Sequence, residues 1–82
     1  MSTREPAGPP PEVVAIADES IRLGQFLKLA GLADSGAHAR ELLEDEVVTV
    51  NGEPEQRRGR QLRTGDVVVV DLPAGPSSAV VG

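Results

Sequence analysis

The sequence contains a single aromatic residue, Phe26, and neither cysteine nor tryptophan. Disulfides and thiolate metal sites are therefore excluded within these 82 residues, and the core must be built from aliphatic side chains. A chain of this length buries only about 60% of the surface that its unfolded form exposes. One small domain with a small aliphatic core is the expectation.

Two helices are expected in the first half of the chain. Apolar residues recur at i, i+3, i+4 and i+7, which predicts a helix within residues 21–30 that Gly31 ends. Either Asp34 or Ser35 can cap a second helix, which continues to Glu44.

Short strands are expected in the second half and at one position before the helices. Alternating or β-branched residues predict strands at 13–17, 47–50, 53–56 and 67–72. Asn51-Gly52 is typical of a tight hairpin turn, and Pro54 indicates an edge strand. The predicted fold class is α+β, with two helices packed on a small, mostly antiparallel sheet.

The ends of the chain differ in composition from its centre. Proline, glycine and serine predict a disordered tail over residues 1–12 and a flexible tail over residues 73–82, on either side of a domain at 13–72. No stretch approaches the roughly 20 apolar residues of a membrane span, and no secretory signal is recognised. A cytoplasmic monomer without a membrane partner is the expectation.

The charge of the chain is unevenly distributed. A formal net charge of −5 argues against a polyanionic partner. However, Arg57, Arg58, Arg60 and Arg63 lie in one short stretch with no acidic residue among them, and binding depends on the local field. We expect that replacing Arg57, Arg58 and Arg60 together by alanine leaves the thermal stability nearly unchanged.

Several short motifs occur in an order and spacing that resemble the S-four RNA-binding domain, and in particular the small bacterial proteins that consist of little else. The resemblance covers residues 21–70 and is carried by Ile21-Arg22-Leu23 with Phe26-Leu27, Gly31-Leu32, Ser35 with Ala39-Arg40, Val48-x-Val50-Asn51-Gly52, and Leu62-x-x-Gly65-Asp66-x-Val68. It implies the alpha-L RNA-binding motif, in which two helices and a hairpin form one face that grips structured RNA, commonly ribosomal RNA or tRNA. A ribosomal subunit is a candidate partner.

The same resemblance implies a set of RNA-contacting residues. By position these are Arg22, Lys28, Ser35, Gly36, His38, Arg40, Asn51, Arg57, Arg58 and Arg60. The chemistry agrees, because the unpaired amides that open the second helix suit a phosphate. Arginine can also bind phosphate oxygens in a bidentate manner, and the lack of stacking aromatic residues favours a folded RNA over single-stranded readout.

Two positions depart from the family pattern. The family often has an acidic residue where Gly24 stands, and it usually has a glycine where Glu46 stands. The first departure predicts a softer helix. The second predicts a positive φ angle at Glu46, at the junction between helix and strand.

Catalysis has little support in the sequence. His38 is the one imidazole that could activate Ser35, yet it has no identified orienting acid, and no phosphate-binding glycine loop is present. We therefore expect no catalytic residues, no metal and no cofactor. Two alternatives stay open: a β-grasp sulfur carrier, which would need a terminal Gly-Gly in place of Val81-Gly82, and a protein-interaction module.

Overall fold

The computed structural model describes residues 12–82 and has the expected α+β composition. Its helices are α1 (Leu23–Leu29) and α2 (Gly36–Glu44). Its strands are β1 (Glu12–Val14), β2 (Ser20–Arg22), β3 (Val48–Val50), β4 (Glu53–Pro54), β5 (Gln61–Arg63), β6 (Val67–Leu72) and β7 (Gly75–Val81). The predicted tail at 1–12 lies outside the described residues except for Glu12, which belongs to β1.

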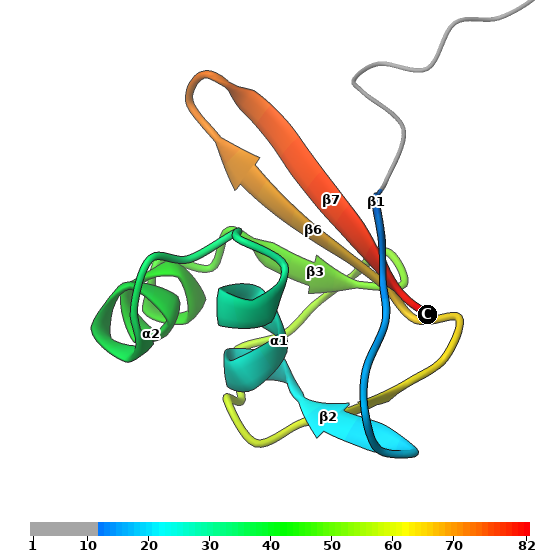
Figure 1. Ribbon diagram of the computed structural model, residues 1–82. Coiled ribbons are helices and arrows are strands. Elements are labelled where there is room, and N and C mark those ends of the chain that lie inside the picture. Colours follow the sequence, from blue (N-terminus) through cyan, green and yellow to red (C-terminus); the bar gives the residue numbers. More distant parts are fainter. Residues whose placement is uncertain (1–11) are drawn as a thin grey trace, which may run out of the picture.

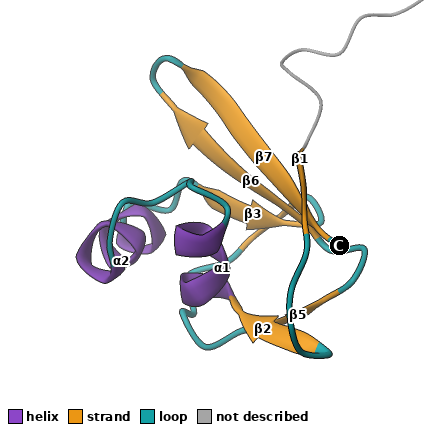
Figure 2. Ribbon diagram, viewed as in Figure 1, coloured by secondary structure: helices purple, strands orange, loops and turns teal. Residues whose placement is uncertain are grey.

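Five of the strands form one sheet in the order β1-β7-β6-β3-β4. The β1–β7 pair is parallel and the other neighbours are antiparallel, as the prediction of a mostly antiparallel sheet requires. Both helices lie on one side of this sheet, while the β6–β7 hairpin extends beyond them (Figure 1). A separate two-stranded sheet, β2 with β5, lies at the base of α1 (Figure 2).

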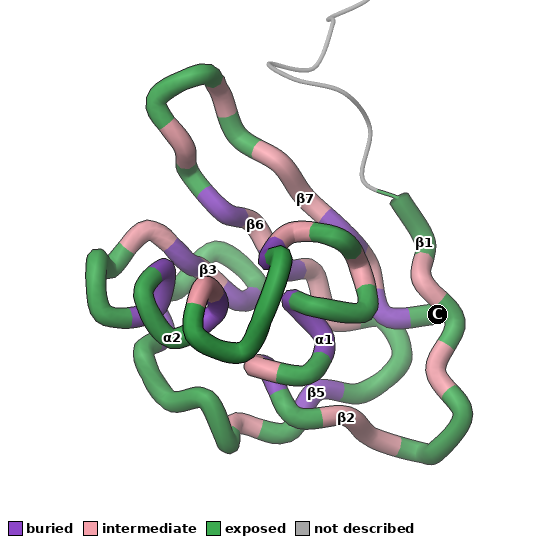
Figure 3. The backbone as a smooth tube through the Cα atoms, turned by 60° about the vertical axis from the view of Figure 1, so that its left-hand side comes forward, coloured by how far each residue is buried: buried purple, intermediate pink, exposed green. Residues whose placement is uncertain are grey.

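The core is aliphatic apart from one ring, as the composition predicts. Phe26 is fully buried and belongs to one hydrophobic cluster with buried residues of α1, α2, β3, β6 and β7. Buried positions are drawn purple along the backbone in Figure 3. Burying a side chain of this size contributes about 1.5–3 kcal/mol. The remaining core residues are Leu23, Leu27, Ala33, Ala39, Leu42, Leu43, Val48, Val50, Leu62, Val68, Val70, Ala79 and Val81.

The second helix begins where the sequence indicated. The Ser35 hydroxyl accepts a hydrogen bond from the backbone N–H of His38 at 3.1 Å, which satisfies one of the four amides left free at the start of a helix. Ser35 is thus confirmed as the N-cap, in preference to Asp34.

The hairpin turn is also confirmed. Asn51 and Gly52 have φ angles of 52° and 86°, which are the positive values of a tight hairpin turn. The Asn51 side chain accepts from the N–H of Val67 at 2.9 Å and donates to Asp66 at 3.1 Å. The Asp66 carboxylate also accepts a hydrogen bond from the backbone N–H of Arg63. This bond, together with the one from the Asn51 side chain, lowers the pKa of Asp66. These bonds tie the turn to the start of β6.

The predicted flexible tail at 73–82 is wrong for most of its length. Residues 75–81 form β7, which pairs with β6 from Val67↔Val80 to Leu72↔Gly75 and buries Ala79 and Val81. Glycine, proline and serine obscured the strand in the sequence. Its backbone hydrogen bonds to β6 outweigh this weak local preference. The sequence predicts no strand at residues 61–63, yet they form β5, whose partner β2 is distant in sequence.

The junction after α2 contains the expected strain. Glu46 has a φ angle of 61°, a left-handed conformation that costs a residue with a Cβ atom roughly 1–2 kcal/mol. Its N–H donates to the carbonyl of Leu43 at 3.2 Å, so the backbone reverses here to enter β3. The conformation follows from the turn and not from a preference of glutamate.

We therefore expect Glu46→Gly to raise the free energy of unfolding by about 1 kcal/mol, because glycine adopts this φ without strain. For a domain of this size the melting temperature should rise by about 4–8 °C. Glu46→Ala is the matched control, since it removes the same charge but keeps the Cβ atom. Equal gains in both variants in urea or thermal unfolding would refute the backbone explanation.

Candidate functional site

The pairing of β2 with β5 places the basic loop beside the first helix. β2 runs directly into α1 at Leu23, and β5 begins at Gln61, directly after the arginines. The register Arg22↔Gln61 therefore lays the loop over residues 57–60 against the start of α1.

Backbone hydrogen bonds continue this contact into the helix. The N–H of Leu23 donates to the carbonyl of Arg60 at 2.8 Å, and the N–H of Gly24 donates to the carbonyl of Arg58 at 3.0 Å. The loop thus supplies acceptors for two amides of the first turn, where Arg22 makes no side-chain cap. At Gly24 an added Cβ would lie 3.5 Å from the Cβ of Arg58, so the loop packs directly on the helix backbone.

A groove opens between α1, the start of α2 and this loop. It is lined by Arg22, Gly24, Gln25, Lys28, Gly36, Ala39, Arg58 and Gly59. Three of these residues carry positive charge, and none of the described lining residues is acidic. Gly36 opens α2, so its N–H belongs to the helix-terminal amides that lack an intrahelical acceptor. The arrangement can hold an anion between cations from two elements.

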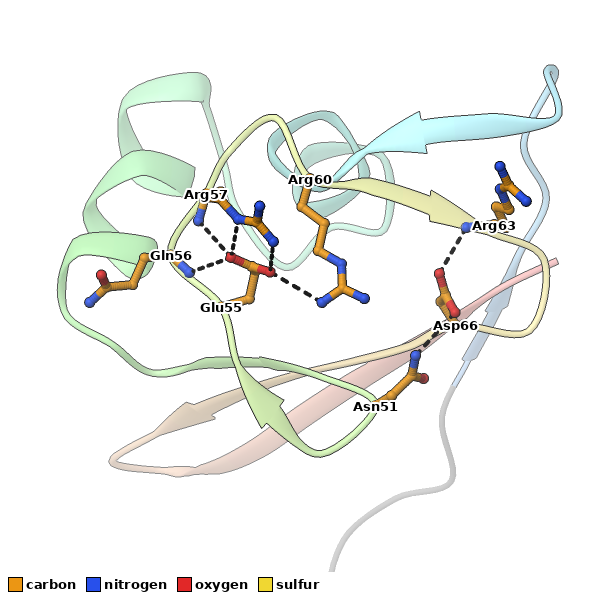
Figure 4. Close-up of polar contacts among 7 residues, drawn as sticks. All are labelled: Asn51, Glu55, Gln56, Arg57, Arg60, Arg63 and Asp66. Carbon is orange, nitrogen blue, oxygen red and sulfur yellow. Dashed lines mark hydrogen bonds and ion pairs between the residues drawn. The ribbon is translucent and has the colours of Figure 1, made fainter.

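The other two loop arginines are engaged inside the loop. Glu55 is only 8% exposed, and its carboxylate accepts from Nε and Nη2 of Arg57 and from Nη1 of Arg60 at 3.0–3.1 Å (Figure 4). It also accepts from the backbone N–H groups of Gln56 and Arg57, each at 3.1 Å. Burial of a carboxylate is tolerated here because its oxygens are fully hydrogen-bonded.

These contacts change how Glu55 titrates. The side-chain hydrogen bonds from Arg57 lower the pKa of Glu55 from 4.5 to about 2, assisted by the N–H of Arg57 and by Arg60, and opposed by burial. In return the carboxylate raises the pKa of Arg57.

The expected tolerance of the loop to alanine must therefore be corrected. Replacing Arg57, Arg58 and Arg60 together would leave the buried carboxylate of Glu55 without its guanidinium partners. An unpaired buried charge is strongly destabilising. The sequence did not reveal this, because Glu55 lies outside the run of arginines and its burial depends on the fold.

The remaining predicted contact residues do not line the groove within the described part of the chain. Ser35 caps α2, and His38 accepts at Nδ1 from the N–H of Asp34 at 3.0 Å. Arg40 lies 3.5 Å from Glu44 in an exposed ion pair, and Asn51 is bonded to β6 and its preceding turn. Each therefore has an internal partner in the structure.

Gln25 is a polar groove residue that the sequence interpretation missed. A signal was present, because Gln25 and Lys28 are spaced by three residues and so lie on one side of α1. Gly24, Ala39 and Gly59 complete the floor and carry no chemical signal of their own.

Over residues 12–82, no helix is long and apolar enough to cross a membrane. In the same range no group of three or more histidine, aspartate or glutamate side chains is placed to hold a metal ion.

Comparison with known proteins assigns the family. A family model described as "S4 domain" matches residues 14–75. The chain belongs to the S4 domain family. A relative from Bacillus subtilis (strain 168), named "Probable ribosome maturation protein RlbA", is 50% identical over 58 residues, which cover 71% of this chain and 82% of the relative. The resemblance to the S-four domain is thereby confirmed, with RNA binding as the function at the level of the family.

Family membership also overturns the β-grasp alternative. The order of elements agrees, since α1 and α2 both precede the β3–β4 hairpin. Moreover Val81 is buried and paired within the sheet, with its carbonyl accepting from the N–H of Gly65 at 2.8 Å.

Glu55 should make stability depend on acid in a defined direction. Its folded-state pKa is lowered, so the stabilisation is complete above pH 4.5 and is lost as the pH falls toward about 2. Glu55→Gln should cost about 1.5–3 kcal/mol at pH 7, the usual range for hydrogen bonds to a charged group. The difference from the wild type should shrink steadily as the pH is lowered.

Urea denaturation at a series of pH values measures this difference. Glu53→Gln is the control, because Glu53 is exposed on β4 and loses the same formal charge. A deficit for Glu55→Gln that stays constant from pH 7 to pH 2 would contradict the assigned role of the carboxylate.

Proposed function

We propose that this protein is a non-catalytic RNA-binding protein that grips the phosphate backbone of a folded RNA in the groove between α1, α2 and the 57–60 loop. The observation that carries the proposal is the convergence of Arg22, Lys28 and Arg58 on one groove without an acidic residue among its described lining. A cationic groove of this kind raises the local concentration of a polyanion even in a protein with net charge −5.

The proposed contacts differ in chemical role. Arg58 and Arg22 offer guanidinium groups that can bind phosphate oxygens in a bidentate manner, whereas Lys28 offers a point charge. The N–H of Gly36 and the amide of Gln25 add hydrogen-bond donors. Because the groove lacks aromatic residues on which bases could stack, we infer recognition of RNA shape and backbone.

Ribosomal RNA is the RNA that we propose. The support comes from the relative of 50% identity, whose name links it to ribosome maturation. Such a role would place the protein in the cytoplasm, with a ribosomal subunit or its precursor as partner. Ultraviolet crosslinking in cells, followed by sequencing of the attached RNA, tests this part of the proposal; reads scattered over messenger RNA alone would count against it.

The groove itself is tested by charge removal. Arg58→Ala should weaken binding to transcribed ribosomal RNA about tenfold and reduce the slope of log affinity against log salt by about 0.7–0.9, the contribution of one neutralised phosphate. Lys28→Ala should reduce the slope similarly. The thermal melt should change little, because no described hydrogen bond involves either side chain.

Arg63→Ala is the matched control for Arg58→Ala. Arg63 lies on β5, does not line the groove, and its side chain points away from Glu55 and Asp66 (Figure 4). The two variants lose the same charge. If both weaken RNA binding equally, the interaction is a diffuse attraction and the groove is not the site. If the wild type itself binds no RNA, the proposal fails and a protein-interaction module becomes the favoured alternative.

A further inference from the structure

We propose that Glu55 is a positioning residue for RNA binding: its buried carboxylate fixes the 55–60 loop so that Arg58 alone of the three loop arginines is presented to the groove. The inference rests on the proposed function, since it assigns how that groove is built.

The first step is the unequal use of the three arginines. Arg57 and Arg60 point toward Glu55, and their guanidinium groups donate hydrogen bonds to its carboxylate at 3.0–3.1 Å (Figure 4). Arg58 lies between them in sequence and lines the groove instead. The loop therefore has two arginines bonded to Glu55 and one, Arg58, that lines the groove.

The second step is that the loop backbone is held from both sides. On one side, the Glu55 carboxylate accepts from the backbone N–H groups of Gln56 and Arg57. The backbone N–H of Glu55 donates to the carbonyl of Val48 at 3.0 Å. On the other side, the carbonyls of Arg58 and Arg60 accept from the first turn of α1. With its backbone fixed at these points, the Cα–Cβ direction of Arg58 is set before RNA arrives.

Such preorganisation affects affinity because ordering a flexible loop on binding consumes part of the interaction free energy. Without the carboxylate, Arg57 and Arg60 lose their common acceptor, and the N–H groups of Gln56 and Arg57 lose theirs. The backbone contacts to α1 and to Val48 remain, but the segment between them is held less firmly. Arg58 would then sample orientations away from the groove.

The decisive feature is that positioning and simple electrostatics predict opposite signs. Glu55→Gln removes a negative charge from the protein and frees two cations, so electrostatics alone predicts tighter binding to a polyanion. Positioning through Arg58 predicts weaker binding. We expect Glu55→Gln to lose about tenfold in affinity for transcribed ribosomal RNA while the salt slope stays the same or steepens.

Glu53→Gln is again the matched control, because Glu53 is exposed two residues away and the variant removes the same formal charge. It should bind RNA as tightly as the wild type, or slightly more tightly. Affinities are compared at neutral pH and at a temperature where circular dichroism shows every variant to be folded, so that lost stability does not enter the measured affinity.

A double-mutant cycle separates positioning from a general structural role. If Glu55 acts through Arg58, the loss caused by Glu55→Gln should disappear when Arg58 is already alanine. An equal loss in both backgrounds would overturn the inference, as would binding by Glu55→Gln as tight as that of Glu53→Gln. Neither of these results would contradict the proposed function. The proposed function fails if the wild type binds no RNA, or if Arg58→Ala binds RNA as tightly as the wild type.

Discussion

The pairing of β2 with β5 is the constraint on which the candidate site depends. These two short strands connect the start of α1 to the end of the basic loop, and they hold Arg22 opposite Gln61. The loop can then supply carbonyl acceptors to α1, which has no side-chain cap of its own. One local pairing thus both completes the first helix and forms a wall of the groove.

Charge in this protein is organised by burial more than by composition. Glu55 is buried, and its charged carboxylate is stabilised there because two guanidinium groups and two backbone amides donate hydrogen bonds to it. The same bonds neutralise much of the positive charge that the run of arginines suggests. Of the three loop arginines, Arg58 is the one that joins Arg22 and Lys28 in the groove. An acidic protein can in this way present one cationic groove.

The sheet of this chain extends past the segment shared with the family. The family match ends at residue 75, where β7 begins, and β7 then pairs with β6 from Gly75 to Val80 and with β1 on its other side. The antiparallel partner shields the edge of the most apolar strand, which would otherwise present unpaired backbone groups. Residues 76–81 are therefore structural in this protein, although their composition is that of a loop.

The family resemblance implied the positive φ angle at Glu46, and the structure chose Ser35 over Asp34 as the cap of α2. The sequence by itself determined the elements whose signals are local: both helices, the Asn51-Gly52 turn, β3 and β6. Each depends on neighbours within a few residues, so periodicity and capping suffice. Tertiary structure alone decided β2 with β5, β7, and which cations face the groove. Those outcomes depend on hydrogen-bond partners and on burial contributed by distant segments. Glu55 shows the physical reason: an isolated glutamate in a sequence is a surface charge, and only the folded chain makes it a buried acceptor.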